Sequence, residues 1–100
     1  MTTPEGKIKD KVKKLLKSFG DIVYYHMPVQ NGMGSPTLDF IVCVGGYFLA
    51  IETKAPGGKP TQRQQITMET MRVAGAFVFV VAGDDDLARL EETIILVLNQ

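Results

Sequence analysis

Two acidic residues and one lysine are spaced so that they meet at one end of a β-hairpin. Two apolar, β-branched runs are separated by Gly45-Gly46. This is a strong signal for a two-residue hairpin loop, because both glycines can take positive φ. Such a loop sets the register, and counting back from it places Asp39 opposite Glu52. Lys54 lies two residues after Glu52, so it occupies the same face of the strand.

These three residues point to metal-assisted chemistry on a phosphate. Opposed carboxylates repel, and a hard divalent cation such as Mg²⁺ or Mn²⁺ would compensate for the repulsion. Such a cation polarises a phosphodiester and acidifies a bound water, while a lysine beside it can orient that water. A structural ion network among Asp39, Glu52 and Lys54 is the alternative that the spacing leaves open. From the repulsion alone, Asp39→Asn is expected to stabilise the metal-free protein.

The rest of the chain predicts the elements that hold this hairpin. Helical spacing, caps and turn residues predict a helix over 3–20, strands over 22–26, 38–44 and 47–54, a helix over 61–74, a strand over 76–81 and a helix from 84. The order α-β-β-β-α-β-α predicts an α/β fold, a small mixed sheet flanked by helices, with the third and fourth strands parallel. The strand over 76–81 is apolar throughout, which is typical of a strand buried on both faces.

Composition sets the class of protein. One hundred residues, 45% hydrophobic and without net charge, predict one globular domain over 1–100. No apolar run approaches the roughly 18 residues of a membrane span, and no signal peptide is evident, so we expect a cytoplasmic protein. The single cysteine, Cys43, is expected to be a buried small hydrophobe. The single histidine, His26, leaves little basis for a histidine metal site.

Basic residues gather near the N-terminus. Residues 1–20 carry six lysines against two acids: Lys7, Lys9, Lys11, Lys13, Lys14 and Lys17 against Glu5 and Asp10. A basic helix attracts a nucleic-acid backbone, although a solvated helix face is the simpler interpretation of this pattern alone. Lys59 and Arg63 could also grip a DNA backbone, with plain surface charge as a near-equal alternative.

Two stretches resemble a known nuclease family. Asp39, followed by Ile51-Glu52-Thr53-Lys54 after a hairpin, resembles the PD-(D/E)xK nuclease superfamily and its restriction-endonuclease-like core. Residues 58–64 (GKPTQRQ) and 74–78 (AGAFV) are similar to the virus-type replication-repair nuclease domain, VRR-NUC. The positions that match its motif are Glu5, Asp39, Glu52, Lys54 and Gln64. The family usually has proline before the aspartate, where this chain has Leu38.

The resemblance implies metal-dependent cleavage of DNA and assigns roles to residues. Asp39, Glu52 and the Thr53 carbonyl would hold Mg²⁺ or Mn²⁺, and Lys54 would position the attacking water. Glu5 would bind a second cation or a metal-bound water. The alternative is that Glu5 only stabilises the helix dipole. Gln64 would orient Lys54 or the water. The alternative is that Gln64 only forms the reciprocal cap with Thr61.

The resemblance also implies the partners. Lys7, Lys11, Lys14, Asn31, Lys59 and Arg63 would contact DNA. Small stand-alone members resemble phage or bacterial proteins that act on branched, Holliday-junction-like DNA, in the cytoplasm of a bacterial or phage-infected cell. A homodimer is expected, since two sites related by a dyad could cut both strands of a symmetric junction. No organic cofactor is expected. The alternatives are an end-trimming repair nuclease, a restriction-like nuclease, and a DNA-binding module of the same fold without catalysis.

Overall fold

The structure is a computed structural model that describes residues 2–30 and 34–100. The elements in chain order are α1 (Pro4–Ser18), a 3-10 turn (Gly20–Ile22), β1 (Val23–His26), β2 (Phe40–Val44), β3 (Tyr47–Thr53), α2 (Gln62–Val73), β4 (Phe77–Val81) and α3 (Asp84–Leu98). The strands form one mixed sheet in the order β1-β2-β3-β4, antiparallel except for the parallel pair β3 and β4. The predicted α/β architecture and element order are confirmed.

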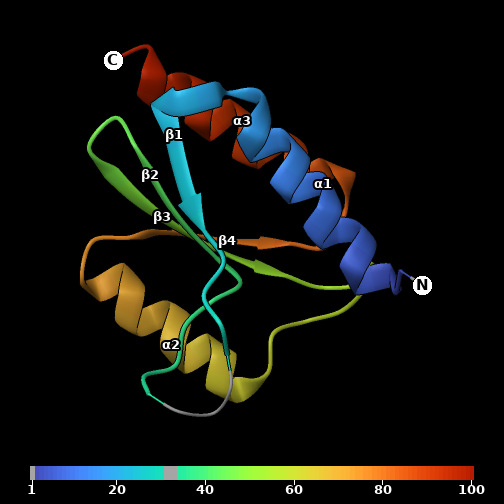
Figure 1. The fold of residues 1–100 in the computed structure, drawn as a ribbon. Helices are drawn as coiled ribbons and strands as arrows, with labels where there is room; N and C mark the ends of the chain where they lie inside the picture. Colours follow the sequence, from blue (N-terminus) through green and yellow to red (C-terminus); the bar gives the residue numbers. More distant parts are fainter. Residues whose placement is uncertain (1, 31–33) are drawn as a thin grey trace.

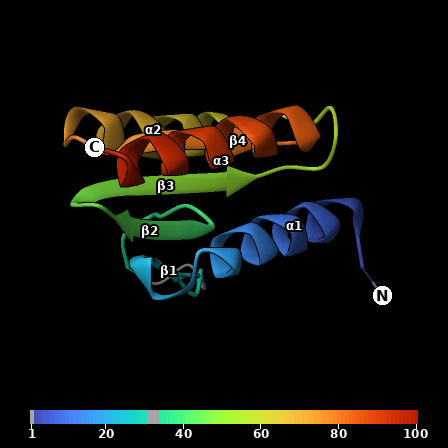
Figure 2. The ribbon, with the colours of Figure 1, turned by 90° about the horizontal axis from the view of Figure 1, so that it is seen from above.

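Helices cover both faces of the sheet (Figures 1 and 2). Helices α1 and α3 lie on one face and α2 lies on the other. The larger core joins α1 and α3 to alternate strand residues such as Phe40, Leu49 and Ile51. A smaller core places Met68 of α2 against Leu38 and Ala50. Within the described part of the chain, no helix is long and apolar enough to cross a membrane.

The helix boundaries follow from local capping chemistry. The Thr3 hydroxyl accepts a hydrogen bond from the Gly6 amide at 3.0 Å and starts α1. Thr61 and Gln64 form a reciprocal capping box at the start of α2, as the sequence predicts. Gly75, at φ +105°, follows the end of α2 and turns the chain into β4. Because each signal is read within a few residues, tertiary packing is not needed to place these ends.

The hairpin has the predicted register. Gly45 and Gly46 have φ values of +57° and +84°, and Val44 pairs with Tyr47 directly beside them. Pairing continues to Phe40 and Ile51 and ends there. The chain bends at Asp39, and its carboxylate reaches Thr53, the residue after Glu52, instead of pairing directly across the ladder with Glu52. The tight turn therefore delivers both acids to the same end of the sheet.

One expectation about burial is wrong and another holds only in part. Strand β4 is an edge strand, and the exposed fraction of Phe77 is 46%. Its continuous apolar pattern arises because both faces are covered by helices, although one long edge has no neighbouring strand. Cys43 is exposed rather than buried. It lies near the turn on the α2 side of the sheet, where the helix does not cover the strand.

Candidate active site

Asp39 is anchored to the end of β3. It is 8% exposed and directly precedes the first residue of β2. Its Oδ2 accepts hydrogen bonds from the Thr53 amide at 2.9 Å and from the Thr53 hydroxyl at 2.7 Å. Its Oδ1 accepts a weaker one from the Gln30 side-chain amide at 3.3 Å. The end of β3 and the loop that contains Gln30 thus hold the carboxylate in place. The sequence interpretation, which considered only repulsion between Asp39 and Glu52, did not include these partners.

Glu52 is buried on the side of the sheet that α2 covers. It is 4% exposed, and its Oε2 accepts a hydrogen bond from Gln64 Nε2 at 2.8 Å. The same oxygen lies 3.7 Å from Lys54 Nζ. The Oε1 of Gln64 accepts from the Thr61 amide at 2.9 Å. The two roles predicted for Gln64 therefore coexist, since one end of its amide caps α2 and the other holds Glu52.

The pKa of Glu52 is set first by its burial and then by the charged groups around it. Burial raises the pKa of Glu52 from 4.5 to about 7, and the nearby charge of Asp39 adds to the increase. The Lys54 ammonium opposes this increase, Glu5 adds to it, and the Asp39 backbone amide lowers it. A cation beside Glu52 would favour its ionised form, which is the form that binds a metal.

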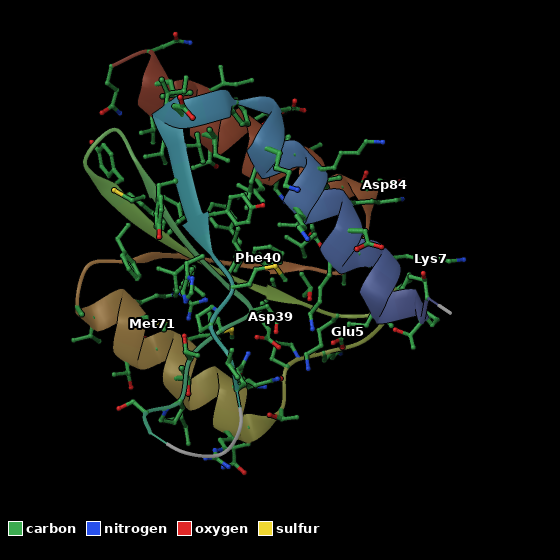
Figure 3. The ribbon with its side chains drawn as sticks, viewed as in Figure 1. Glu5, Lys7, Asp39, Phe40, Met71 and Asp84 are labelled. Atoms are coloured by element: carbon green, nitrogen blue, oxygen red, sulfur yellow. The ribbon has the colours of Figure 1, made fainter. Side chains whose placement is uncertain are left out.

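Glu5 joins the site through a residue that the sequence analysis did not select. Lys9 lies one helical turn after Glu5, and its Nζ is 3.7 Å from Glu5 Oε2 and 3.7 Å from Asp39 Oδ1. Figure 3 shows Glu5 and Asp39 where the start of α1 approaches the sheet, with Lys7 pointing outward. The contacts form two neighbouring groups. Lys9 joins Glu5 to Asp39, and Glu52 joins Lys54 to Gln64. The charges of Asp39 and Glu5 both act on Glu52, so the five motif residues lie in one region of the molecule.

The donor set fits a small hard cation. Within residues 2–30 and 34–100, no three His, Cys, Asp or Glu side chains lie close enough together to form a metal cage. Mg²⁺ seldom needs one, because one or two carboxylates, substrate phosphate oxygens and waters usually complete its shell. Asp39 and Glu52 supply the carboxylates, and the Thr53 carbonyl belongs to the residue between Glu52 and Lys54. The chemistry of these oxygen donors suits Mg²⁺ or Mn²⁺.

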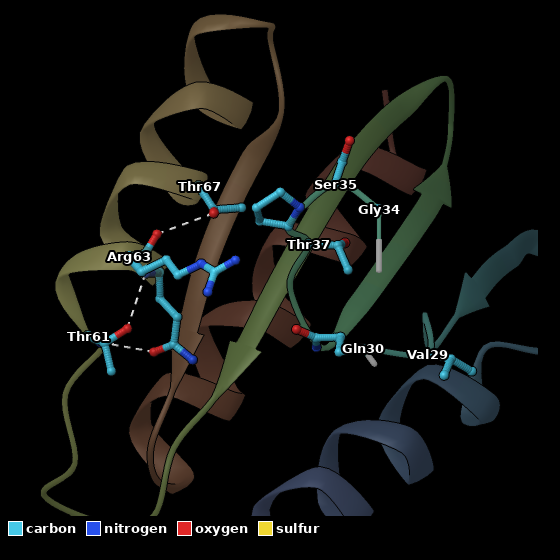
Figure 4. Close-up of a pocket in the computed structure, with 10 residues that line it drawn as sticks. Val29, Gln30, Gly34, Ser35, Thr37, Thr61, Arg63 and Thr67 are labelled. Atoms are coloured by element: carbon cyan, nitrogen blue, oxygen red, sulfur yellow. Dashed lines mark hydrogen bonds between the residues drawn. The ribbon is translucent and has the colours of Figure 1, made fainter. Parts of the chain in front are cut away.

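A pocket lies next to the two glutamines that donate to the carboxylates, although the carboxylates themselves do not line it. It has a volume of about 260 Å³ and lies between the loop before β2 and the first turns of α2 (Figure 4). Gln30 and Gln64 line it, and these are the amides that donate to Asp39 and Glu52, respectively. Arg63 extends into it from α2. The pocket therefore offers a positive side chain directly beside the site.

The other residues predicted to contact DNA are more scattered. Lys7, Lys14 and Lys59 are exposed. Lys11 instead pairs with Asp84 at the start of α3, with 2.9 Å between Nζ and Oδ1. Asn31 lies outside the described residues. Among the members of this group that the structure describes, only Arg63 lines the pocket next to Gln30 and Gln64.

Three contributors were not identified from the sequence: Lys9, Gln30 and the Thr53 hydroxyl. The spacing of four between Glu5 and Lys9 was an available signal, because such pairs are neighbours on a helix. The two other contacts with Asp39 had no local signal in the sequence. Gln30 lies nine positions before Asp39, and Lys9 lies in a different element, α1. The Thr53 hydroxyl follows from hairpin geometry only once Asp39 is seen to turn toward it.

Comparisons with known proteins bear on the whole fold. No family model matches this sequence, and no curated protein matches it either. A solved structure described as a VRR_NUC domain is similar to this chain, with a TM-score of 0.77 and 26% sequence identity. The similarity covers 91% of this chain and 97% of the other. The resemblance predicted from the motifs is therefore confirmed, and the chain has the fold of a VRR_NUC nuclease domain.

Proposed function

We propose that this protein is a metal-dependent nuclease that hydrolyses phosphodiester bonds of DNA. The observation that carries the proposal is the placement of two buried carboxylates and a lysine at one end of β3. Asp39 and Glu52 are 8% and 4% exposed, and the Lys54 ammonium lies 3.7 Å from Glu52. Burying this much charge is costly unless it is paired or binds a ligand. The similarity to a VRR_NUC domain supports the same reaction class.

Each site residue has a role that its contacts support. Asp39, Glu52 and the Thr53 carbonyl hold Mg²⁺ or Mn²⁺, which when bound polarises the phosphate and acidifies water. Lys54 orients the attacking water and stabilises the negative charge that builds on the phosphate. Gln64 keeps Glu52 in place through its 2.8 Å hydrogen bond. Glu5 serves a second cation or a metal-bound water from the start of α1.

DNA binding rests on the basic residues around the site. Arg63 contacts a backbone phosphate from the pocket, and Lys59 lies in the loop just before α2. Lys7 and Lys14 extend the surface along α1. Lys11 would contribute after leaving Asp84, and Asn31 is proposed from the family resemblance. Contacts of this kind position the duplex without reading its sequence.

The finer proposal is that the substrate is branched DNA, cut by a homodimer. One domain of this size presents little surface for a four-way junction. Two copies related by a dyad would place two sites on the symmetric strands. We therefore expect faster cleavage of four-way junctions than of linear or flap substrates.

Cleavage assays test the reaction. Supercoiled and branched DNA are incubated with wild-type protein and Mg²⁺, Mn²⁺ or EDTA, and with Asp39→Asn, Lys54→Ala and Lys17→Ala. Lys17 is exposed in the last turn of α1 and serves as the charge-matched control. The first two variants should lose at least ~100-fold in rate, and EDTA should stop the reaction. Undiminished cutting by both site variants would refute the assignment, whereas DNA binding without cutting by wild type would favour the non-catalytic module.

Substrate choice and assembly are tested separately. Equal rates on linear, flap and four-way DNA would contradict the preference for branches. Light scattering of the protein eluting from a sizing column measures the assembly, and a monomer at assay concentrations would contradict the dimer. Neither result would affect the reaction itself, which is tested by the site variants.

A further inference from the structure

Lys9 holds a position in the site that no motif assigns to it. Its ammonium is 3.7 Å from Glu5 and 3.7 Å from Asp39, so it bridges the two carboxylates. The side chain of Asp39 is only 9% exposed, whereas that of Lys9 is 35% exposed. Lys9 thus reaches from the rim of the site onto a nearly buried carboxylate.

The local charges show what this bridge does. The site contains three carboxylates, from Glu5, Asp39 and Glu52, and two ammonium groups, from Lys9 and Lys54. Lys54 pairs with Glu52, which leaves Lys9 to neutralise the other two acids. In the metal-free protein Lys9 therefore supplies part of the positive charge that a divalent cation would bring.

A divalent cation on Asp39 would compete with this arrangement. The Lys9 ammonium lies within 4 Å of Asp39 Oδ1, so it would repel a divalent cation and compete with it for this carboxylate oxygen. The Lys54 side chain is only 14% exposed and its ammonium is paired with Glu52, so it is less able than Lys9 to move into water. Lys9 is more exposed and has a long flexible stem, so it can move into water.

We propose that Lys9 is the counter-cation of the metal-free site, occupying the Asp39 carboxylate until a divalent cation displaces it. This inference rests on the proposed function, since it concerns the same cation site. Its consequence is that Lys9 stabilises the empty site and weakens metal affinity, so it sets the cation concentration at which the site fills. Lys9 is a positioning residue in this scheme, and Asp39 remains the ligand.

Calorimetric titration of the DNA-free protein with Mn²⁺ tests this competition. The proteins compared are wild type, Lys9→Met, Lys9→Arg and Lys13→Met. Lys13 is an exposed lysine one helical turn further along α1, so its variant removes the same charge away from Asp39. Lys9→Met should bind Mn²⁺ roughly three- to tenfold more tightly than wild type. The Mn²⁺ affinity of Lys9→Arg should stay within about twofold of wild type, because arginine keeps the positive charge. The affinity of Lys13→Met should also stay within about twofold, because Lys13 is not paired with Asp39.

The melting temperature in EDTA provides a second test of the pairing of Lys9 with Glu5 and Asp39. In EDTA, Lys9→Met should melt at a lower temperature than Lys13→Met, because Glu5 and Asp39 lose their shared partner. Equal or weaker Mn²⁺ affinity in Lys9→Met than in Lys13→Met would overturn the proposal. Failure of the proposed cation site itself would look different, since wild type and Asp39→Asn would then show the same absence of Mn²⁺ binding.

Discussion

The two ends of the β2–β3 hairpin reverse the usual relation between polarity and burial. At the open end, the acidic side chains of Asp39 and Glu52 are buried. At the turn end, Cys43 and Phe48 pair across the ladder, yet Cys43 is exposed and Phe48 is 44% exposed. The same two strands thus bury carboxylates at one end and leave a large apolar side chain in water at the other.

The difference lies in what surrounds each end. The buried acids receive hydrogen bonds from Thr53, Gln30 and Gln64 and face two lysines. These contacts come from α1, α2, β3 and a loop, and together they offset the cost of removing charge from water. At the turn end the Tyr47 hydroxyl donates to Gln100 at 2.7 Å, but the side chains of Cys43 and Phe48 remain exposed. Buried acidic groups with several hydrogen-bond and ion-pair partners are typical of functional sites.

The largest effect on stability is expected at Asp39. Asp39→Ala leaves the Thr53 amide and hydroxyl without their acceptor, which should lower the free energy of unfolding by about 3 kcal/mol. Asp39→Asn keeps one acceptor oxygen and should lower it by about 1 kcal/mol. This reverses the stabilisation expected from charge repulsion alone. Urea denaturation in EDTA measures both changes.

The turn end supplies the control. Cys43→Ala should change the free energy of unfolding by less than ~0.5 kcal/mol, because the side chain is exposed. If Asp39→Ala proved as harmless as Cys43→Ala, the contrast between the two ends would disappear.

A somewhat smaller effect is expected from the titration of Glu52. Its pKa is raised in the folded protein from 4.5 to about 7, so the folded state binds the proton more tightly than the unfolded state. Its stabilising contribution is therefore full below about pH 4.5 and is lost as pH rises to about 7. We expect metal-free wild type to lose ~2 kcal/mol of stability relative to Glu52→Gln over this range. Denaturation of both proteins at several pH values in EDTA measures the difference in their free energies of unfolding. If this difference stayed constant from pH 4.5 to pH 8, the pKa of Glu52 would not be raised in the folded protein.

The smallest effect is expected at Gln64. Gln64→Ala removes half of the capping box and the hydrogen bond to Glu52, which should cost about 1 kcal/mol. The neighbouring Gln65 donates only to the Pro60 carbonyl at the surface, so Gln65→Ala should cost less than ~0.5 kcal/mol. Equal melting temperatures for the two variants would show that the contact with Glu52 adds nothing to stability.

Most of the fold could be predicted from short-range patterns. The Gly45-Gly46 turn and the Thr61 cap act within a few residues, so their outcome does not depend on the rest of the molecule. Burial was harder to predict, because it depends on which strand is last in the sheet and where each helix ends. The apolar run of β4 could not show that one edge lacks a partner, and Cys43 could not show that α2 stops short of it.

The candidate site divides along the same line. Glu52 and Lys54 are two residues apart on one strand, and the hairpin register adds Asp39, so sequence spacing was sufficient to group them. The contacts of Lys9 and Gln30 with Asp39 depend on how α1 and the loop pack against the sheet. No periodicity in the chain encodes such a contact.

The sequence by itself determined the order of the elements, the hairpin register and the end of the sheet where the acids gather, because turns, caps and strand alternation act over a few residues. Only the tertiary structure decided how that charge is balanced. Lys9, which also pairs with Glu5, reaches Asp39 from α1, and Gln64 reaches Glu52 from α2. Such partners are chosen by the packing of α1 and α2 on opposite faces of the sheet, which no local signal specifies.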